Sequence, residues 1–130
     1  MPNIPIGTAG EYKTRVTPDI ATSFLGIEDA RVLSTPEMIR FMERTCRDAV
    51  LPLLESGHDT VGTHVDVYHL AAAPVGTSVV FKAKVTEVDD RRIQFDVEAA
   101  SEQGKIGEGT HERRIVNVAK FAARQAEKRK

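Results

Sequence analysis

Apolar residues recur every three or four positions between positions 35 and 54, and this spacing predicts an amphipathic helix of about five turns. The apolar positions are 38, 39, 41, 42, 46, 49, 50, 53 and 54. Ser34 or Thr35 can cap the first turn, and Pro36 fits there because a first-turn N–H has no partner within the helix. Gly57 then ends the segment.

From Thr63 onward the hydrophobic period changes to two, which predicts strands with one buried and one polar face. The inward positions are Val65 and Val67, then Val79, Phe81, Ala83 and Val85, then Ile93, Phe95, Val97 and Ala99. Short turn-like segments at 74–76, 89–91 and 102–104 separate these runs, as they do between antiparallel neighbours. We therefore expect the later strands to form a meander.

A short strand at 11–16 precedes the helix, and a strand at 105–118 closes the series. The last strand carries Gly107 and Gly109, which permit a bulge or the close approach of another backbone. Residues 120–130 form a basic helix or tail. This order predicts one α+β domain over residues 1–130, with an antiparallel five-stranded sheet curled over one helix.

Composition narrows the class of protein further. With 28% charged residues and a formal net charge of -1, the chain gives no support for a nucleic-acid partner. The single cysteine, Cys46, excludes an intrachain disulfide and fits a reducing compartment. The N-terminal residues lack a basic start followed by an apolar stretch, and no run of about 18 apolar residues occurs. We expect a cytoplasmic protein with no membrane partner.

Two polar residues interrupt the apolar pattern. Glu43 lies in the helical row of Ile39, Cys46 and Val50, and His69 continues the alternation of the strand that begins near Thr63. Both side chains should point inward, and a buried carboxylate requires a partner. Each residue also has a simpler interpretation, since Glu43 can pair with Arg40 or Arg47 on the helix surface and His69 can be an ordinary core histidine.

Thr35 is the third candidate, with helix capping as its structural alternative. It lies on the same side of the helix as Glu43, about 12 Å away along the axis, so the two can flank a small cavity without bonding directly. The other histidines provide no metal site. His64 and His69 lie on opposite strand faces, and His111 is surrounded by charged residues.

Three segments together carry a family resemblance. The stretch from Thr35 through FMERTC, then GTHVDVYHLAAAPVG, and finally IGEGTHERRIVNVAKF resemble the hotdog-fold thioesterases, specifically the fluoroacetyl-CoA thioesterase-like branch. The likeness spans residues 35–121. It implies a hotdog fold, hydrolysis of an acyl-CoA thioester, and a catalytic triad of Thr35, Glu43 and His69. No cofactor is implied beyond the coenzyme A of the substrate.

The resemblance also implies a backbone contact from Gly62 to the thioester oxygen and a binding role for Arg113. It further implies sites shared between subunits, and hence a homodimer or a dimer of dimers, which the exposed sheet edges independently favour. Residues 17–33 form a shorter segment than in the fluoroacetyl-specific enzyme, with Phe24 as the only aromatic residue. We therefore expect a small or medium acyl-CoA rather than fluoroacetyl-CoA.

Two other functions remain open at this point. A hotdog domain can bind an acyl-CoA or another acyl ligand without cleaving it. The fold also hosts enoyl-CoA hydratases, but Asp66 and His69 are three residues apart, on opposite strand faces, and do not match the aspartate and histidine motif of those enzymes.

Overall fold

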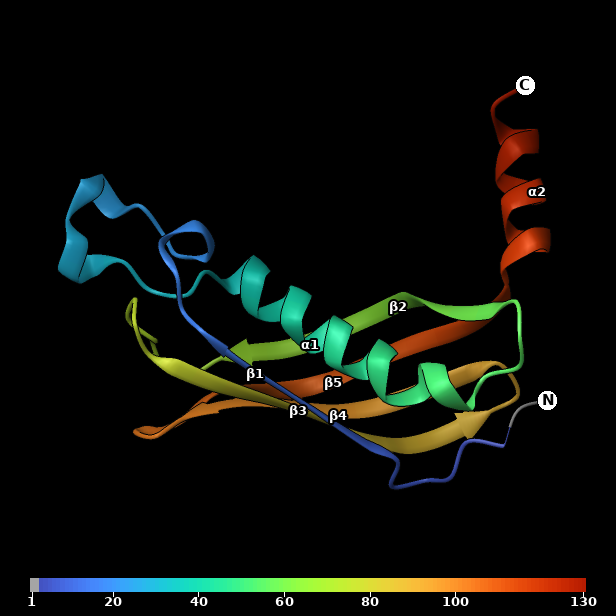
Figure 1. Ribbon diagram of the computed structural model, residues 1–130, viewed down its shortest axis with the longest axis horizontal. Coiled ribbons are helices and arrows are strands. Elements are labelled where there is room, and N and C mark those ends of the chain that lie inside the picture. Colours follow the sequence, from blue (N-terminus) through green and yellow to red (C-terminus); the bar gives the residue numbers. More distant parts are fainter. Residues whose placement is uncertain (1–2) are drawn as a thin grey trace.

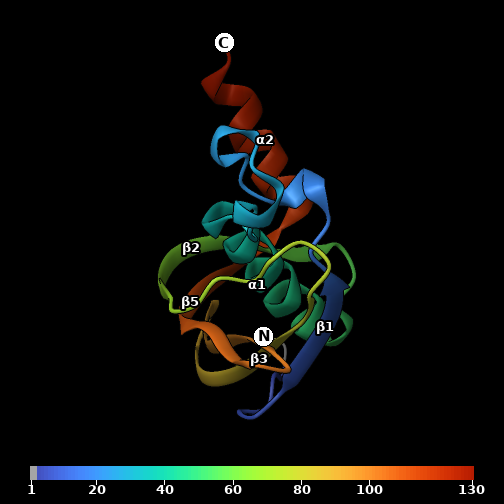
Figure 2. The same ribbon diagram turned by 90° about the vertical axis from the view of Figure 1, so that its left-hand side faces the viewer.

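The computed structural model describes residues 3–130 and shows a five-stranded antiparallel sheet curled around one long helix (Figures 1 and 2). In chain order the main elements are β1 (Ala9–Arg15), α1 (Thr35–Val50), β2 (His58–His69), β3 (Ser78–Asp89), β4 (Arg92–Ser101), β5 (Gly104–Asn117) and α2 (Val118–Lys128). Short 3-10 turns lie at Pro18–Ile20, Phe24–Gly26, Glu28–Ala30 and Leu51–Leu53. The predicted order of one strand, one long helix and four strands is confirmed.

Helix α1 begins at Thr35, where Ser34 is the N-cap and its hydroxyl accepts a hydrogen bond from the Glu37 N–H at 3.4 Å. The α-helix ends at Val50, four residues before the predicted end, and Leu51–Leu53 form a 3-10 turn. Pro52 accounts for the difference, because proline has no N–H to donate and its ring clashes with the preceding turn of an α-helix.

The strands lie in the order β1-β3-β4-β5-β2, and every neighbouring pair is antiparallel. The meander prediction is correct for β3, β4 and β5. It is wrong for the connection through 74–76, because β2 lies at the far edge beside β5 and is not a neighbour of β3. Ala73 is buried, and its carbonyl accepts a hydrogen bond from the Leu33 N–H at 2.8 Å. This connection therefore packs against the residues that lead into α1.

Strand β2 begins at His58, five residues before the start predicted from the period-two pattern. The register against β5 shifts between Gly62 and His64, which leaves Thr63 as an extra residue. Thr60, on the N-terminal side of the shift, is buried. The shift interrupts the alternation of buried and exposed residues along β2. The period-two pattern therefore predicts only the C-terminal half of the strand.

The core fills the space between α1 and the inner face of the sheet. Phe41 of α1 lies between Tyr12 and Phe81, with ring centroids 5.6 Å and 5.3 Å away. Cys46 is fully buried on the same helix, and burial raises the pKa of its thiol to about 12. The cysteine is therefore an apolar filler, as its position in the sequence indicates.

Two parts of the chain project from the sheet and α1 on the same side of the molecule, at opposite ends (Figure 1). One is the segment 17–33, and the other is α2, which contains most of the predicted basic tail. Within residues 3–130, no helix is both long and apolar enough to cross a bilayer.

The close packing of β2 on β5 yields a stability test at Gly109. A Cβ at this position would overlap the Asp66 carbonyl oxygen and lie 2.6 Å from the Val67 Cα. Backbone atoms cannot yield as a flexible side chain can, so we expect Gly109→Ala to lower the free energy of unfolding by about 1–3 kcal/mol. Urea unfolding measures this, with Glu108→Ala on the exposed face as the control. Equal stability of the two variants would contradict the packing.

Candidate active site

Thr35 and His69 meet where α1 begins and β2 ends. The Thr35 hydroxyl lies 2.7 Å from His69 Nδ1. The capping interpretation of Thr35 is wrong, because Ser34 provides the cap and leaves the Thr35 hydroxyl free. The sequence thus predicted both residues, and the structure places them in direct contact.

The imidazole of His69 is kept neutral by its surroundings. Burial lowers its pKa, and a smaller effect of the Ala71 backbone opposes the shift. Its Nε2 is buried and has no hydrogen-bond partner among residues 3–130. A neutral ring with one nitrogen on Thr35 and the other unpaired is suited to proton transfer.

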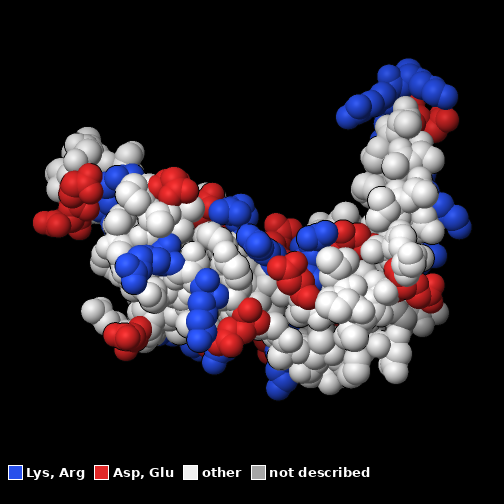
Figure 3. All heavy atoms as spheres, in the orientation of Figure 1, with Lys and Arg blue, Asp and Glu red and all other residues white. Residues whose placement is uncertain are grey.

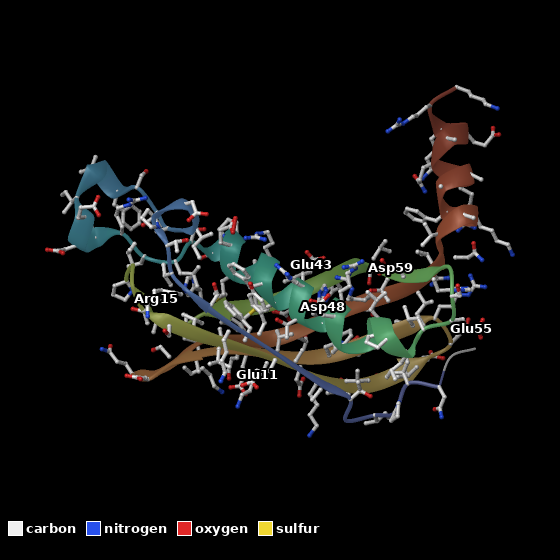
Figure 4. The ribbon with its side chains drawn as sticks, viewed as in Figure 1. Glu11, Arg15, Glu43, Asp48, Glu55 and Asp59 are labelled. Carbon is white, nitrogen blue, oxygen red and sulfur yellow. The ribbon has the colours of Figure 1, made fainter. Side chains whose placement is uncertain are left out.

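Glu43 projects from the middle of α1 (Figure 4) and forms an ion pair with a residue on β5. Arg113 Nη1 donates to Glu43 Oε2 at 3.1 Å. The Arg113 side chain is 6% exposed, whereas that of Glu43 is 41% exposed. The carboxylate is therefore held from the inside by a buried cation and keeps its outer side open.

The helix-surface alternative for Glu43 is wrong. Arg40 instead pairs with Glu37 at 2.8 Å. Arg47 pairs with Asp59 of β2 at 2.7 Å, and this arginine lowers the pKa of the Asp59 carboxyl. Arg40 and Arg47 are thus both paired with carboxylates other than Glu43.

Arg113 is fixed by three further contacts. Its Nε donates to Thr60 Oγ1 at 2.7 Å and its Nη2 to the Thr60 carbonyl at 2.9 Å. Its Nη1 lies 3.2 Å from His111 Nε2, while His111 Nδ1 lies 2.7 Å from the His64 carbonyl. The carbonyl can only accept, so Nδ1 carries the proton and Nε2 accepts from Arg113. This bonding pattern requires a neutral His111.

The sequence pattern did not indicate His111 or Thr60 as residues of the site. His111 is 1% exposed, and burial lowers its pKa, with the Arg113 charge acting in the same direction. The signal was the period-two alternation of β5, in which His111, Arg113 and Ile115 share the inner face. The acidic and basic neighbours of His111 concealed this alternation.

Gly62 lies directly against the carboxylate of Glu43. A Cβ at this position would overlap Glu43 Oε2 and lie 3.2 Å from His111 Cε1. Gly62 pairs with Arg113 across the two strands. A side chain at this position would displace the Glu43 carboxylate from the backbone, so Gly62 and Glu43 belong to one site.

Within residues 3–130, these residues lie in two separate groups. Thr35 and His69 form one group, and Glu43, Gly62 and Arg113 form the other with Thr60 and His111. The groups lie about 12 Å apart along α1 and about 20 Å apart along β2. No hydrogen bond within residues 3–130 joins them. One chain therefore does not unite the predicted triad.

A hollow of about 810 Å³ lies elsewhere, on the outer face of the sheet. Its charged lining includes Lys105, which pairs with Glu108 at 2.7 Å. None of the five predicted site residues lines it. Among residues 3–130, no cluster of three or more histidine, cysteine or acidic side chains has the arrangement of a metal site.

An antiparallel sheet wrapped around a central helix is the hotdog fold, and polar groups between α1, β2 and β5 fit the thioesterase class within it. Solved structures agree with this class. The fluoroacetyl-CoA thioesterase FlK superposes with a TM-score of 0.87 at 32% identity, covering 97% of this chain and 98% of the other. A thioesterase superfamily member from Thermus thermophilus gives 0.86 at 33% identity, covering 99% and 97%.

Sequence comparison assigns the family. Residues 16–119 match the fluoroacetyl-CoA-specific thioesterase family. The fluoroacetyl-CoA thioesterase of Streptantibioticus cattleyicolor is 38% identical over 101 residues, which cover 78% of this chain and 73% of that enzyme. The chain belongs to the fluoroacetyl-CoA-specific thioesterase family, and it is a thioester hydrolase.

The network around Arg113 predicts a pH dependence of stability. An unfolded histidine titrates near pH 6.5, and the folded pKa of His111 is lower, so the unfolded chain binds more protons in acid. The free energy of unfolding should therefore fall as the pH drops below about 6.5. In His111→Gln the amide oxygen can still accept from Arg113 but cannot be protonated, so the fall should be smaller. Urea unfolding between about pH 8 and 5 measures it, and an unchanged slope would refute the role of His111.

Proposed function

We propose that the protein hydrolyses a small or medium acyl-CoA to the free acid and coenzyme A, using Thr35, Glu43 and His69. The observation that carries this proposal is the half-exposed Glu43 carboxylate, held by buried Arg113 against the backbone of Gly62. The substrate class is supported by relatives, since a mutant of the fluoroacetyl-CoA thioesterase was solved in complex with acetyl-CoA.

In the proposed reaction, Glu43 either removes a proton from the water that attacks the thioester carbonyl, or attacks that carbonyl itself to give a transient anhydride that water then hydrolyses. In both routes the C–S bond breaks and the coenzyme A thiolate leaves. Arg113 binds only Oε2, which leaves the second carboxylate oxygen for this step. The Gly62 N–H stabilises the developing oxyanion. Thr35 orients the water or the carbonyl, and His69 relays a proton toward the departing thiolate sulfur. The side chains supply this chemistry without a cofactor.

We further propose that a homodimer completes each site. Strand β2 is a sheet edge whose ladder partner within residues 3–130 is β5 alone. Apolar side chains are exposed along and just beyond it, with Val65 at 42%, Tyr68 at 66% and Leu70 at 54%. An apolar edge with unpaired backbone groups favours pairing with a second copy.

The register of that pairing is part of the proposal. We place the twofold axis at Val65 or Asp66, close to the strand centre; residues opposite each other in an antiparallel pair then face the same side. With the extra residue Thr63 counted, His69 of one protomer then lies opposite Thr60 or Gly62 of the other. Either register brings His69 to the Glu43 group of the partner.

The preference for a substrate other than fluoroacetyl-CoA rests on the segment before α1. Phe24, the only aromatic residue of this segment, is 57% exposed within residues 3–130. We place the reaction in the cytoplasm, because the lone cysteine fits a reducing compartment.

The catalytic assignment is tested with a panel of short, branched and aromatic acyl-CoAs, fluoroacetyl-CoA included, by following thiol release. Glu43→Gln and His69→Ala should each reduce turnover by about 10²–10⁴-fold while the fold is retained. Glu37→Gln, on the same helix but paired with Arg40, should retain full activity. Acyl-CoA binding without thiol release from the unmodified protein would support a ligand-binding protein instead.

The shared site is tested by mixing the two inactive chains. If Glu43 and His69 act across the interface, a mixed dimer of Glu43→Gln and His69→Ala chains has one intact site and one doubly altered site. Random exchange of protomers should then restore about a quarter of the wild-type rate. If both residues act within one chain, each site keeps one lesion and the mixture stays inactive.

A further inference from the structure

Both projections of the molecule carry apolar side chains that stay exposed within residues 3–130. Helix α2 contains 11 residues, none of them buried, although its hydrophobic side carries Val118 and Phe121. An isolated helix of this length is marginal in water. An amphipathic helix that stands away from the sheet therefore needs a packing surface outside its own chain.

The segment 17–33 presents such a surface at the other end of the molecule. Its tip carries Phe24, Leu25 and Ile27, which are 57%, 97% and 55% exposed. Leu25 also has a φ of 55°, a left-handed conformation that is uncommon for a leucine. A strained and fully exposed leucine between two other exposed apolar residues indicates a contact surface.

This tip has a defined shape because Arg31 braces it from inside. Arg31 Nε donates to the Thr22 carbonyl at 2.9 Å, and its Nη2 donates to the Pro18 carbonyl at 2.7 Å. The Thr22 N–H in turn donates to the Val32 carbonyl at 2.8 Å. The apolar tip is thus held in place before any partner binds.

The charges of the two projections are opposite. The segment 17–33 carries Asp19, Glu28 and Asp29 against the single base Arg31, whereas α2 and the two residues after it carry Lys120, Arg124, Lys128, Arg129 and Lys130 against the single acid Glu127. Figure 3 shows acidic groups at one projection, basic groups at the other and a hollow surface between them. Apolar contact and charge are therefore both complementary.

The two projections cannot meet within one chain, because they lie at opposite ends of a molecule in which α1 alone spans about 24 Å. A twofold axis through β2 exchanges these ends and keeps both projections on the helix side of the sheet. We propose that α2 of each protomer packs on the segment 17–33 of a second copy of this chain. This inference rests on the dimer of the proposed function.

The contact would link dimerisation to the site. Segment 17–33 runs directly into Ser34 and Thr35, and Leu33 bonds to Ala73 just beyond the end of β2. The C-terminal helix of one protomer thus braces the chain that positions the Thr35–His69 pair of the other.

The test mixes two full-length chains, one carrying Ser23→Cys and the other Ala122→Cys, and treats them with a short bis-maleimide. Both sites are exposed, Ala122 lies beside the apolar side of α2, and native Cys46 is buried. We expect cross-linked heterodimers at a yield on the order of tenfold above control, because packing raises the local thiol concentration. The control replaces Ser23→Cys with Ile6→Cys, which is 69% exposed but lies near Val85, at the end of the sheet where α2 begins.

A charge swap provides the second measurement. Arg124→Glu should lower the cross-linking yield several-fold, and Asp29→Lys in the other chain should restore it. Light scattering on the same samples reports the dimer separately. A dimer whose cross-linking does not exceed the Ile6 control overturns the α2 contact and leaves the dimer proposal standing. A monomer overturns both.

Discussion

The buried guanidinium of Arg113 is the constraint around which the site is organised. A cation enclosed between a helix and a sheet is tolerated only when its donors are satisfied, and here Thr60, His111 and Glu43 accept from it. These three acceptors lie on β2, β5 and α1, respectively. The cost of leaving this charge unpaired therefore fixes α1, β2 and β5 relative to one another and sets the carboxylate of Glu43 against Gly62.

Much of this architecture was predictable from local patterns. The three-four spacing predicted α1, and the alternation predicted β3, β4 and the C-terminal half of β2. The inward positions of Glu43 and His69 followed from the same rows. Pattern alone did not give the position of β2 in the sheet, because strand order depends on which edges meet in space. It also missed His111, since a charged neighbourhood in the sequence gives no information about burial.

The partner of Glu43 could not be predicted from local patterns either. Arg113 follows it by 70 residues, and nothing local distinguishes this arginine from Arg40 or Arg47. The family resemblance pointed to Arg113, and the structure shows which groups this arginine contacts. The triad itself stays a prediction, because the described chain brings Thr35 to His69 and Glu43 to Arg113 but does not join the two pairs.

The extra residue at Thr63 has a consequence for the whole strand. Thr60 and Gly62 face the helix on one side of it, and Val67 and His69 face the helix on the other. A regular strand of the same length would turn the second set toward the outer surface. A single inserted residue thus reverses the inward and outward alternation halfway along the strand. Both ends of β2 can therefore place functional side chains on the same face of the sheet.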